Sequence, residues 1–491
     1  MLIPRDSALA RDLSNTIGMA VRCVIVGAGI SGLALADALC ARGIEPLVLE
    51  SAPRAGGKIE TRNRGELVVE CGPAGFLDRE PAMMRLASSL GLRVVDALPA
   101  ARRRAVLAGG NLLEVPRGPR DLLSTTLLSA HGKLRLLGDL FVRRSKGRGD
   151  ESVGAFARRR LGSEAAERVF FPLVSGLYAG DPDRISLAAA FPWLARLEAA
   201  HRSLLIGAAR ELGGRRAGSR LRTFASGMEE LPRALARRLG NTLRLGAAVR
   251  ALSATPAGWR LSVDEQGAAS ELEAPAIALA VPAYEAARLV ASVSPAAHAA
   301  TSAIEYVPVI LVYLAYRVEQ LAVPADLYGF LSARGGSTRL LGAVFHSAAF
   351  PARAPQGTVL VSARLGGARD PAIGALNDAQ LVGLAHQELA ALLRISGAPL
   401  DTQVIRHARA LPQYTIGHTL RLALLDDAER ACPGLFFAGN AYRGLGVPDC
   451  VAAATRRADE IAAYLSAQGV DGKRGAREQG ERFSQADLRG P

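Results

Sequence analysis

The sequence is poor in residues that cross-link a chain or bind metals. Its five cysteines are scattered without a Cys-x-x-Cys pair, which argues against a disulfide framework, a zinc ribbon or a redox dithiol. Such cysteine usage fits a reducing, cytoplasmic setting. The seven histidines show no His-Glu-x-x-His or similar ligand spacing, so we expect no metal site. The cysteines are Cys23, Cys40, Cys71, Cys432 and Cys450.

Long hydrophobic runs are also missing. No stretch approaches the roughly 18 uninterrupted apolar residues of a membrane span, so we expect no transmembrane helix. The first 20 residues contain charges such as Arg5 and Asp6 and no apolar core, so we do not expect a signal peptide. Met19, close to the first predicted strand, is an alternative to Met1 as the start of translation.

Composition and charge favour a globular protein with an anionic partner. Hydrophobic residues make up 49% and charged residues 22% of the 491 residues, which suits a large core and two or three domains. The net charge is +14, and the larger part of the excess lies in residues 101–160. A basic surface suits nucleic acid, a membrane or an acidic substrate, although a general preference for arginine would give the same charge.

Residues 21–50 have the pattern of a strand–helix–strand unit. Residues 21–26 are a short apolar, β-branched run, typical of a buried strand. Helix formers with regularly spaced apolar residues follow at 33–42, and residues 46–49 form a second predicted strand. Glu50 stands at the carboxyl end of that strand.

A Gly-x-Gly-x-x-Gly sequence at residues 27–32 links the first strand to the helix. Gly27 permits a tight turn, Gly29 lets the backbone approach a pyrophosphate, and Gly32 lets the helix pack on the sheet. The helix N-terminus presents unpaired N–H groups to phosphates, and Glu50 can accept from a ribose 2′-OH. A glycine-rich turn alone would be weak evidence, but strand, helix and acid together predict dinucleotide binding.

The residues that follow Glu50 distinguish an FAD-binding protein from an NAD-binding one. Ser51 begins the sequence Ser-Ala-Pro-Arg-Ala-Gly-Gly-Lys, which ends in Gly57 and Lys58. Its double glycine allows the backbone to come close to the ligand at a second place. Glu-x-x-x-x-x-Gly-Gly-Lys after Gly-x-Gly-x-x-Gly resembles the superfamily of FAD-dependent amine oxidases, phytoene desaturases and protoporphyrinogen oxidases. NAD dehydrogenases lack this extension, so the resemblance implies FAD.

Residues 66–76 predict a strand that enters a glycine–proline turn, Gly72-Pro73-Ala74-Gly75. The turn resembles the family's Glu-x-Gly-Pro-x-x-Phe turn, which lies near the flavin ring. Ala74 and Gly75 replace the commoner polar residues, which puts a side-chain hydrogen bond from this turn in doubt. By its local sequence alone the segment is equally a plain β-turn.

Three arginines, Arg102 to Arg104, precede a predicted strand–turn–strand at residues 105–116. In protoporphyrinogen oxidases an arginine just before such a hairpin pairs with a substrate propionate, and Arg104 matches that place. A planar guanidinium suits a carboxylate. The alternative is a solvated basic turn.

Residues 121–144 have an amphipathic helical pattern. Leucines and Phe141 form one side, and basic residues such as Arg135, Arg143 and Arg144 surround them. Such a helix can lie in a membrane interface, and relatives attach through this region, so we expect peripheral attachment to the cytoplasmic membrane. Core packing would explain most of the leucines equally well.

The apolar segment 172–182 is dense in glycine and proline, which predicts a kinked backbone close to a ligand. Its sequence Ser-Gly-Leu-Tyr-Ala-Gly-Asp-Pro resembles, nearly letter for letter, a passage of bacterial porphyrinogen oxidases. Amine oxidases and desaturases do not carry it. The resemblance implies that Gly176 belongs to the substrate site.

Four β-branched or aromatic runs predict an antiparallel sheet that roofs a ligand cavity. By resemblance, Tyr328, Gly329 and Leu331 lie over the flavin and pack against the tetrapyrrole. Ordinary buried sheet residues would give the same pattern. The runs lie at residues 307–316, 328–331, 341–346 and 359–365.

The C-terminal part extends the resemblance. The sequences at 412–418 and 438–450 resemble protoporphyrinogen oxidases from end to end, and Val249 matches a position whose backbone receives the adenine. Residues 433–440 predict a strand that returns to the dinucleotide sheet, before a helix whose first N–H groups face the flavin. The implied cofactor residues are Gly27, Ala28, Gly29, Ile30, Ser31, Gly32, Glu50, Ser51, Gly57, Lys58, Gly72, Pro73, Ala74, Gly75, Val249, Gly439, Gly446, Val447 and Asp449.

The resemblance covers residues 21–467 and implies a bacterial, oxygen-dependent member of the FAD-dependent protoporphyrinogen oxidase family. The expected fold class is α/β: a Rossmann-like FAD-binding domain, an antiparallel-sheet substrate domain and an inserted α-helical, membrane-binding domain. The expected domains are 21–78, 222–296 and 405–467 for FAD; 95–205 for the insertion; 79–94, 206–221 and 297–404 for the substrate; and a disordered tail at 468–491.

The implied reaction is the six-electron oxidation of protoporphyrinogen IX to protoporphyrin IX via FAD, with release of hydrogen peroxide, in haem biosynthesis. The sequence holds one dinucleotide fingerprint and no paired acid–base motif, so we expect no catalytic side chain. Positioning and the flavin would supply the catalysis. The expected partners are the porphyrinogen, molecular oxygen, a membrane surface and a second copy of the chain, but no nucleic acid.

Three rivals stay open. A coproporphyrinogen III oxidase of the same family would want more cationic contacts, which the basic 101–160 segment allows. A carotenoid desaturase or amine oxidase should show an aromatic amine cage or a flavin-linking cysteine, and Cys450 lies in the wrong motif for that link. A prenyl-binding escort protein can use the fold without redox chemistry, but it would not need the flavin-facing 441–449 turn.

Overall fold

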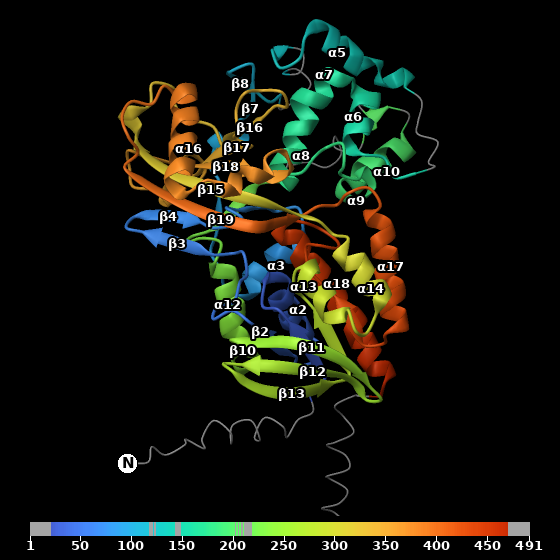
Figure 1. The fold of residues 1–491 in the computed structure, drawn as a ribbon. Coiled ribbons are helices and arrows are strands. Elements are labelled where there is room, and N and C mark those ends of the chain that lie inside the picture. The colour runs from blue at the N-terminus through green and yellow to red at the C-terminus, as the bar shows by residue number, and fades with distance from the viewer. Residues whose placement is uncertain are drawn as a thin grey trace, which may run out of the picture.

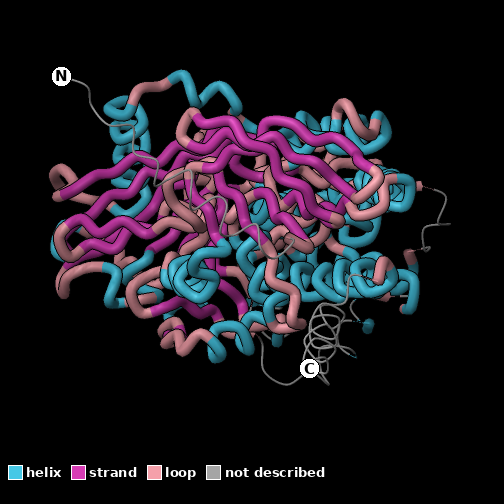
Figure 2. The backbone as a smooth tube through the Cα atoms, turned by 90° about the horizontal axis from the view of Figure 1, so that it is seen from below, coloured by secondary structure: helices cyan, strands magenta, loops and turns pink. Residues whose placement is uncertain are grey.

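The computed structural model describes residues 21–116, 121, 124–142, 149–201, 203–204, 206–207, 210 and 219–469. Figure 1 shows a lower region built around a parallel sheet and an upper region in which a larger sheet lies beside a group of helices. Viewed from below, most helices lie around the strands (Figure 2). No helix in the described ranges is both long and apolar enough to cross a membrane.

A five-stranded parallel sheet forms the centre of the lower region, as the pattern of residues 21–50 predicts. Its strand order is β10–β2–β1–β14–β20, so segments far apart in the sequence meet in it. Every residue of β1 and β14 is buried, because both faces of the sheet are covered. The strands are β1 (Cys23–Val26), β2 (Leu47–Glu50), β10 (Leu243–Leu245), β14 (Ala276–Leu279) and β20 (Leu435–Phe437).

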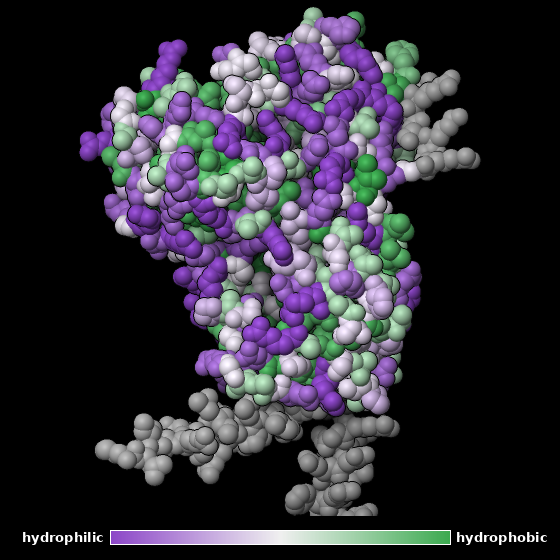
Figure 3. Space-filling model, viewed as in Figure 1, coloured by the Kyte–Doolittle hydropathy of each residue, from purple (hydrophilic) through white to green (hydrophobic). Residues whose placement is uncertain are grey.

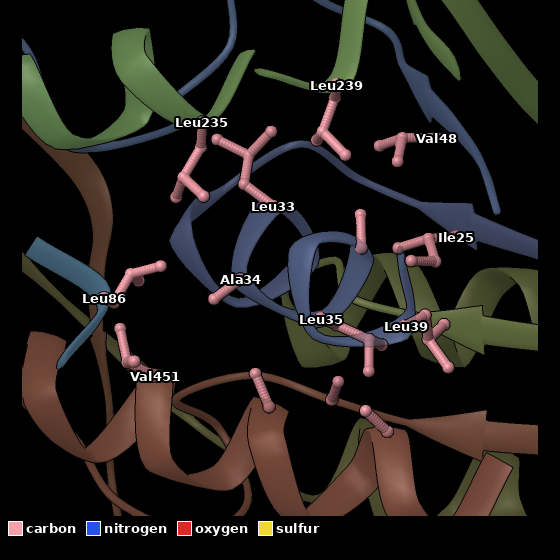
Figure 4. Packing of buried hydrophobic residues seen from close by; sticks show 14 of the residues in the cluster. Ile25, Leu33, Ala34, Leu35, Leu39, Val48, Leu86, Leu235, Leu239 and Val451 are labelled. Atoms are coloured by element: carbon pink, nitrogen blue, oxygen red, sulfur yellow. The ribbon is translucent and has the colours of Figure 1, made fainter. Parts of the chain in front are cut away.

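Helices cover one face of this sheet and enclose α2. Leu33, Leu35 and Leu39 of α2 pack among side chains from the sheet and from three other helices (Figure 4). A helix that is apolar on all sides is stable only when it is buried. The surrounding side chains therefore hold α2 in place, and with it the position of its first turn relative to the sheet. The helices are α2 (Ile30–Cys40), α3 (Pro81–Ser89), α12 (Glu230–Leu239) and α18 (Val447–Ala467).

The opposite face is covered by a three-stranded antiparallel sheet and further helices. Trp259 and Leu261 of the small sheet are buried with Val24 and Leu49 of the parallel sheet in one hydrophobic cluster. This second layer closes the lower region. Its elements are β11 (Ala247–Thr255), β12 (Gly258–Glu265), β13 (Ala268–Ala274), α13 (Ala283–Val290), α14 (Pro295–Ser302) and α17 (His418–Ala431).

The upper region is organised around a seven-stranded sheet of order β19–β15–β18–β17–β16–β7–β8. The antiparallel sheet expected from four runs is confirmed, and β19 and the β7–β8 hairpin extend it. β7 pairs with β16 in parallel, a pairing that no local pattern announces. The strands are β7 (Arg104–Ala108), β8 (Asn111–Glu114), β15 (Tyr306–Arg317), β16 (Gly329–Ser332), β17 (Gly342–Phe345), β18 (Thr358–Gly366) and β19 (Asp401–Pro412).

One face of this sheet is covered by α16 (Asp378–Leu393), with α15 (His346–Ala349) at the end of β17.

Two smaller sheets connect the regions: β3 (Thr61–Arg64) with β4 (Leu67–Glu70), and β5 (Phe76–Leu77), β9 (Leu221–Phe224) and β6 (Val94–Asp96). The 3-10 helices are η2 (Pro99–Arg102), η3 (Gly138–Phe141), η5 (Gly240–Thr242), η6 (Val318–Gln320), η7 (Pro351–Arg353), η8 (Gly367–Arg369) and η9 (Pro371–Ala375).

A group of helices lies beside the large sheet, with its own core around Phe156, Val174 and Leu194. Arg160 and Asp139, both 0% exposed, form an ion pair at 3.2 Å inside it, and Glu198 lies 2.9 Å from the same guanidinium. The helices are α5 (Ala130–Leu137), α6 (Val153–Leu161), α7 (Ser163–Ala165), the π-helix η4 (Ala166–Phe170), α8 (Phe171–Tyr178), α9 (Leu187–Ala190) and α10 (Pro192–Ala200).

One local prediction in this group is wrong. The amphipathic pattern of 121–144 is not one helix: α5 begins at Ala130, because the Ser129 side chain caps it by accepting from the N–H of Gly132 at 3.0 Å. The segment 172–182 is helical to Tyr178 and changes direction at Ala179, with φ of +49°. Leu122, Leu123, Arg143, Arg144, Met19 and residues 470–491 of the predicted tail lie outside the described residues.

Candidate active site

The glycine-rich turn has the geometry of a phosphate cradle. Gly27 has φ of +104°, and its N–H donates to the Leu49 carbonyl at 2.7 Å, which ties the turn to β2. A Cβ added to Gly32 would lie 1.9 Å from the Gly27 carbonyl oxygen, so helix and turn pack too closely for a side chain. A Cβ added to Gly29 would meet nothing within 4 Å. The turn is therefore closed toward the protein and open on the side of Gly29.

The N-terminus of α2 faces the same turn. Gly29 caps the helix without a side-chain hydrogen bond, and Ile30 and Ser31 begin its first turn. The first N–H groups of a helix have no intrahelical acceptor, so they are available to an anion. Ala28, within the turn, donates its N–H to the Glu50 carboxylate at 2.7 Å.

Glu50 stands at the edge of the cradle, as the sequence predicts. Its second carboxylate oxygen accepts from the N–H of Ala52 at 2.9 Å and lies 3.4 Å from Ser51 Oγ. The side chain is half-buried, so the carboxylate keeps accessible surface beside the turn. This placement fits a hydrogen bond to a ribose hydroxyl.

The double glycine and the Gly72–Gly75 turn meet next to the cradle. Gly56 donates its N–H to Ala28 O at 2.8 Å, and a Cβ on Gly57 would lie 3.4 Å from Gly29 Cα. A Cβ on Gly72 would lie 2.1 Å from the Lys58 carbonyl oxygen. Lys58 therefore joins the two glycine segments through its backbone, and Pro73, Ala74 and Gly75 follow directly in the chain.

Lys58 is an unusual lysine in this position. Its ammonium donates to the carbonyls of Arg409 at 2.8 Å and Ala410 at 2.6 Å and lies 5.6 Å from the centre of the Tyr306 ring. Burial lowers the pKa of Lys58 to about 8. The side chain therefore ties β19 of the large sheet to the cofactor region.

A second helix N-terminus lies beside the first. Gly446 caps α18, and its N–H donates to the Asp449 carboxylate at 3.0 Å. Ser31 of α2 and Gly439 line one small cavity with Cys450, so the starts of α2 and α18 converge. Gly439 has φ of +133°, and Val447 opens the first turn of α18. Two converging helix N-termini suit a ligand that carries negative charge at two places.

Val249 lies apart from these glycines on β11. Its carbonyl accepts from Arg288 at 3.1 Å, and a β-bulge separates Val249 from Ala251. The adenine contact that the resemblance implies for Val249 stays a prediction.

The five predicted substrate residues come from separate segments and meet on the large sheet. A Cβ on Gly176 of α8 would lie 2.7 Å from Leu331 Cδ1, so the helix and β16 are in direct contact. Gly329 is opposite Arg104 in the β16–β7 register. The Arg104 guanidinium lies 5.5 Å from the centre of the Tyr328 ring.

Of the two arginines that end next to the sheet, Arg103 and Arg104, Arg104 is the one suited to a ligand. Arg103 forms ion pairs with Glu114 and Asp326. Arg104 is exposed at the start of β7, and none of the described residues forms an ion pair with it. Its guanidinium can therefore receive a carboxylate.

The large sheet is tied to the cofactor region by a buried ion pair. Arg353 of η7 lies 3.2 Å from Glu70 of β4, and both side chains are almost fully buried. The Glu70 carboxylate also accepts from Thr61 Oγ1 at 2.7 Å, while Tyr313 Oη donates to the Glu70 carbonyl at 2.8 Å. Glu70 lies two residues before Gly72, so this network fixes the turn against the sheet.

The sequence interpretation missed Arg353, Glu70 and one further arginine, Arg364 of β18, which donates to the Gly176 carbonyl at 2.7 Å. The available signal was a charged residue within an otherwise apolar strand, Val-Leu-Val-Ser-Ala-Arg-Leu. The 412–418 motif, in contrast, is structural. His418 stacks on Tyr414 at 4.2 Å, and burial lowers its pKa to about 4, so it is neutral at pH 7.

Comparison with known proteins identifies the family. A family model described as flavin containing amine oxidoreductase matches residues 30–462. The chain belongs to this family. It is an FAD-dependent oxidoreductase, and the glycine cradle, the two helix N-termini and Glu50 fit FAD, the cofactor of this family of flavoenzymes.

The relatives of this flavoenzyme are named either protoporphyrinogen oxidase or coproporphyrinogen III oxidase. Chloroplastic protoporphyrinogen oxidase of Nicotiana tabacum is 34% identical, over 90% of this chain and 86% of the relative. Coproporphyrinogen III oxidases of Bacillus subtilis and Propionibacterium freudenreichii are 29% and 33% identical, over 90% and 89% of this chain and 98% and 90% of the relatives.

Solved structures confirm the α/β fold with a Rossmann-like sheet and a second, larger sheet. A crystal structure from Exiguobacterium sp., assigned to protoporphyrinogen oxidase, superposes with a TM-score of 0.78 at 26% identity, covering 91% of this chain and 99% of that one. Putrescine oxidase superposes with a TM-score of 0.69 at 18% identity, covering 90% and 99%, which shows the fold alone.

Proposed function

We propose that this flavoenzyme oxidises protoporphyrinogen IX to protoporphyrin IX with molecular oxygen as the electron acceptor, in haem biosynthesis. One observation carries the proposal: Arg104, Gly176, Tyr328, Gly329 and Leu331, from three separate segments, meet on the sheet that packs against the cofactor turn. A cation beside apolar surface suits a flat macrocycle that bears carboxylates at one edge.

The reaction balances with oxygen alone. Removal of six electrons and six hydrogens from the porphyrinogen reduces three O₂ to three hydrogen peroxide. When bound, FAD would supply the acceptor for a hydride equivalent from the substrate and the route of its electrons to oxygen. The chain carries one dinucleotide-binding fingerprint, at residues 27–32, which this scheme requires.

The protein's own residues hold the cofactor and orient the substrate. The cradle at residues 27–32 and the N-terminus of α18 hold the cofactor, and the network of Glu70 and Arg353 sets the 72–75 turn. Arg104 orients the substrate through a carboxylate, and Leu331 with the Tyr328 ring supplies apolar contact. We assign no side-chain base, so the rate enhancement comes from positioning.

Coproporphyrinogen III is the alternative substrate, because two of the relatives bear the name of that oxidase. Aerobic turnover of the FAD-loaded protein on both porphyrinogens, followed by porphyrin fluorescence, decides between them. A preference for protoporphyrinogen IX supports the proposal. A preference for coproporphyrinogen III keeps cofactor and site but reassigns the substrate, and oxidation of neither would refute the porphyrinogen proposal.

Arg104 gives a matched pair of variants for the same assay. We expect Arg104→Ala to raise KM for the preferred porphyrinogen by roughly tenfold, because a hydrogen bond to a charged group contributes about 1.5–3 kcal/mol. Arg102→Ala is the control, since Arg102 is also exposed but lies outside the sheet, in η2. Equal effects of both variants would count against Arg104 as the carboxylate contact.

We also propose that the enzyme is cytoplasmic and attaches peripherally to the membrane through α5 and η3. Leu134, Leu137, Leu140 and Phe141 are exposed by 69%, 55%, 41% and 83%. Figure 3 shows a few hydrophobic side chains among hydrophilic ones at the top of the molecule, over the region that Figure 1 labels α5. An apolar face of this kind, near basic side chains, suits a lipid interface. A homodimer remains a prediction.

Vesicle co-sedimentation tests the attachment. Leu137→Asp with Phe141→Asp should release the protein from anionic vesicles, because each change places a charge on the proposed interfacial surface. Leu400→Asp is the control, since Leu400 is 53% exposed at a different place in the fold. Binding that survives the double substitution would argue against α5 and η3 as the attachment surface.

A further inference from the structure

Arg364 differs from the other arginines that lie deep in the described part of the chain. Arg160 pairs with Asp139 and Glu198, and Arg353 pairs with Glu70. Arg364 forms no ion pair with any described residue. Its one protein acceptor there is the Gly176 carbonyl, at 2.7 Å. Arg364 is half-buried, and a partly desolvated guanidinium without a carboxylate partner is a candidate for binding an anion.

The register of the large sheet places Arg364 on the same face as the predicted substrate residues. Leu331 of β16 is opposite Gly342 of β17, and Gly342 is opposite Arg364 of β18. Residues directly opposite in neighbouring strands project to the same face of a sheet. Arg104 is opposite Gly329, two residues from Leu331, so it also projects to that face.

The two arginines flank a short apolar stretch of this face. Three strand spacings and a two-residue offset separate their Cα atoms, or roughly 15 Å. Gly176, Leu331 and Val344 lie between them. The separation leaves room for one flat substrate with an anionic group near each guanidinium.

This stretch of the sheet face is only partly covered by the rest of the protein. Tyr328, Leu331, Val344, Arg364 and Gly176 are half-buried, while the residues beside them on the same strands are mostly buried. Burial lowers the pKa of the Arg364 guanidinium and raises the pKa of the Tyr328 phenol. Partly covered side chains that combine apolar surface with a cation are suited to contact a ligand.

We propose that Arg364 is the second anion-binding residue of the substrate site and binds a carboxylate of the porphyrinogen other than the one that Arg104 binds. The inference rests on the proposed function and deepens it: the site recognises a substrate with carboxylates on two different pyrroles. The narrow apolar surface at Gly176 and Leu331 would then receive the macrocycle between the two charges.

A purely structural role for Arg364 makes a different prediction. If the guanidinium only positions α8 through the Gly176 carbonyl, its loss disturbs the pocket for every ligand, charged or not. If it recognises a carboxylate, its loss affects free acids and leaves esters unchanged. Esterified porphyrins therefore separate the two roles.

The experiment measures the Kd of protoporphyrin IX and of its dimethyl ester for the FAD-loaded protein, by quenching of porphyrin fluorescence. We expect Arg364→Gln to weaken free-acid binding roughly 10- to 100-fold and to change ester binding less than about twofold. Arg364→Lys, which keeps the charge but not the fork, should fall between. Arg317→Gln, an exposed arginine at the end of β15, is the control.

Each result has a defined meaning. Equal weakening of acid and ester by Arg364→Gln, or no change in either, would overturn the inference, even if the wild-type protein oxidises porphyrinogens. Failure of the FAD-loaded wild-type protein to oxidise any porphyrinogen would overturn the proposed function and this inference together. A selective loss of free-acid binding, with KM for the porphyrinogen raised in parallel, would support the second contact.

Discussion

The cofactor region and the substrate region of this flavoenzyme are built on opposite principles. The cofactor region presents backbone groups, at Gly27, Gly29 and Gly32 and at the starts of α2 and α18. The proposed substrate region presents side chains, chiefly Arg104 and Arg364, on strands that are distant in the sequence. Backbone recognition requires local geometry, whereas side-chain recognition requires only that the sheet places the right residues together.

This difference determines how each region tolerates change. Where the cradle is closely packed, as at Gly32, it has no freedom to accept an added atom, because the neighbouring carbonyl cannot move away. A pocket lined by side chains can adjust its rotamers, and its chemistry can change one residue at a time. Substitutions at the closely packed positions of the cofactor region should therefore have large effects, and those in the substrate region smaller, graded ones.

The strongest test compares two glycines of the cradle. Gly32→Ala places a Cβ 1.9 Å from the Gly27 carbonyl oxygen, so we expect both lost flavin and a large fall in melting temperature. Gly29→Ala meets no protein atom within 4 Å, so it should preserve the apoprotein's stability and weaken FAD binding alone. Flavin absorbance and thermal denaturation of the apoprotein measure the two effects.

Gly383→Ala serves as the control for these variants. It lies within α16, has nothing within 4 Å of an added Cβ, and should be neutral or slightly stabilising because alanine favours a helix. Normal FAD affinity in Gly29→Ala would contradict a phosphate contact at this glycine. A stable, yellow Gly32→Ala protein would contradict the packing described for the cradle.

The buried Glu70–Arg353 pair, which joins the two regions, should give the next largest effect. Arg353→Met leaves the Glu70 carboxylate buried without its partner, which typically costs about 3–5 kcal/mol in the free energy of unfolding. Burial already raises the pKa of Glu70, and loss of Arg353 raises it further. Because this folded-state pKa exceeds the unfolded one, the loss should be smallest at acidic pH and grow as pH rises through the folded pKa.

Chemical denaturation at several pH values measures this effect. Arg443→Met is the matched control, because Arg443 pairs with Asp426 on the exposed surface, where such pairs contribute about 0–1 kcal/mol. Replacing both Glu70 and Arg353 by apolar residues should restore part of the loss. Equal destabilisation by Arg353→Met and Arg443→Met would mean that the buried pair does not couple the regions.

The same contrast explains what could be predicted from the sequence. The strand–turn–helix at 21–50 is local, so its strands, its glycines and Glu50 were placed correctly from spacing alone. The parallel pairing of β7 with β16 and the meeting of Gly176 with Leu331 depend on long-range topology, which no local pattern contains. Arg364 was missed for this reason: its meaning depends on the strands beside it. The helix predicted over 121–144 is a smaller error. The Ser129 side chain caps α5, so this helix begins at Ala130 although the amphipathic pattern begins earlier.

A glycine of the substrate region should respond more mildly than one of the cradle. Gly176→Ala would place a Cβ 2.7 Å from Leu331 Cδ1, the movable end of a side chain rather than backbone. Overpacking of about 1–3 kcal/mol is largely offset by rotation of Leu331 and by the helix preference of alanine. We expect little change in melting temperature, intact FAD binding and a KM for porphyrinogen raised about threefold to tenfold. Loss of FAD from this variant would show that the two regions are not separable.

Lys58 lies where the regions meet, and its expected effect appears only as a dependence of stability on pH. Burial lowers its pKa from an ordinary 10.5 to about 8, so folding favours the neutral amine. For a group with a lowered pKa, the stabilising contribution is complete above the unfolded value and is lost as pH falls through the folded value. The melting temperature of the wild-type protein should therefore rise relative to that of Lys58→Met between pH 8 and pH 10.5.

Between these two pH values, the melting temperature of the wild type relative to that of Lys58→Met should rise by a few degrees. This corresponds to about 1–2 kcal/mol in the free energy of unfolding, after allowance for the partial exposure of Lys58. Taking the difference between two proteins that share every other titrating group removes the remaining pH dependence. Lys58→Arg provides the control, because a guanidinium stays charged across this range and should show no step near pH 8. Parallel curves for wild type and Lys58→Met would mean that the ammonium is solvated. The hydrogen bonds to the Arg409 and Ala410 carbonyls would then not bury the ammonium where the two regions meet.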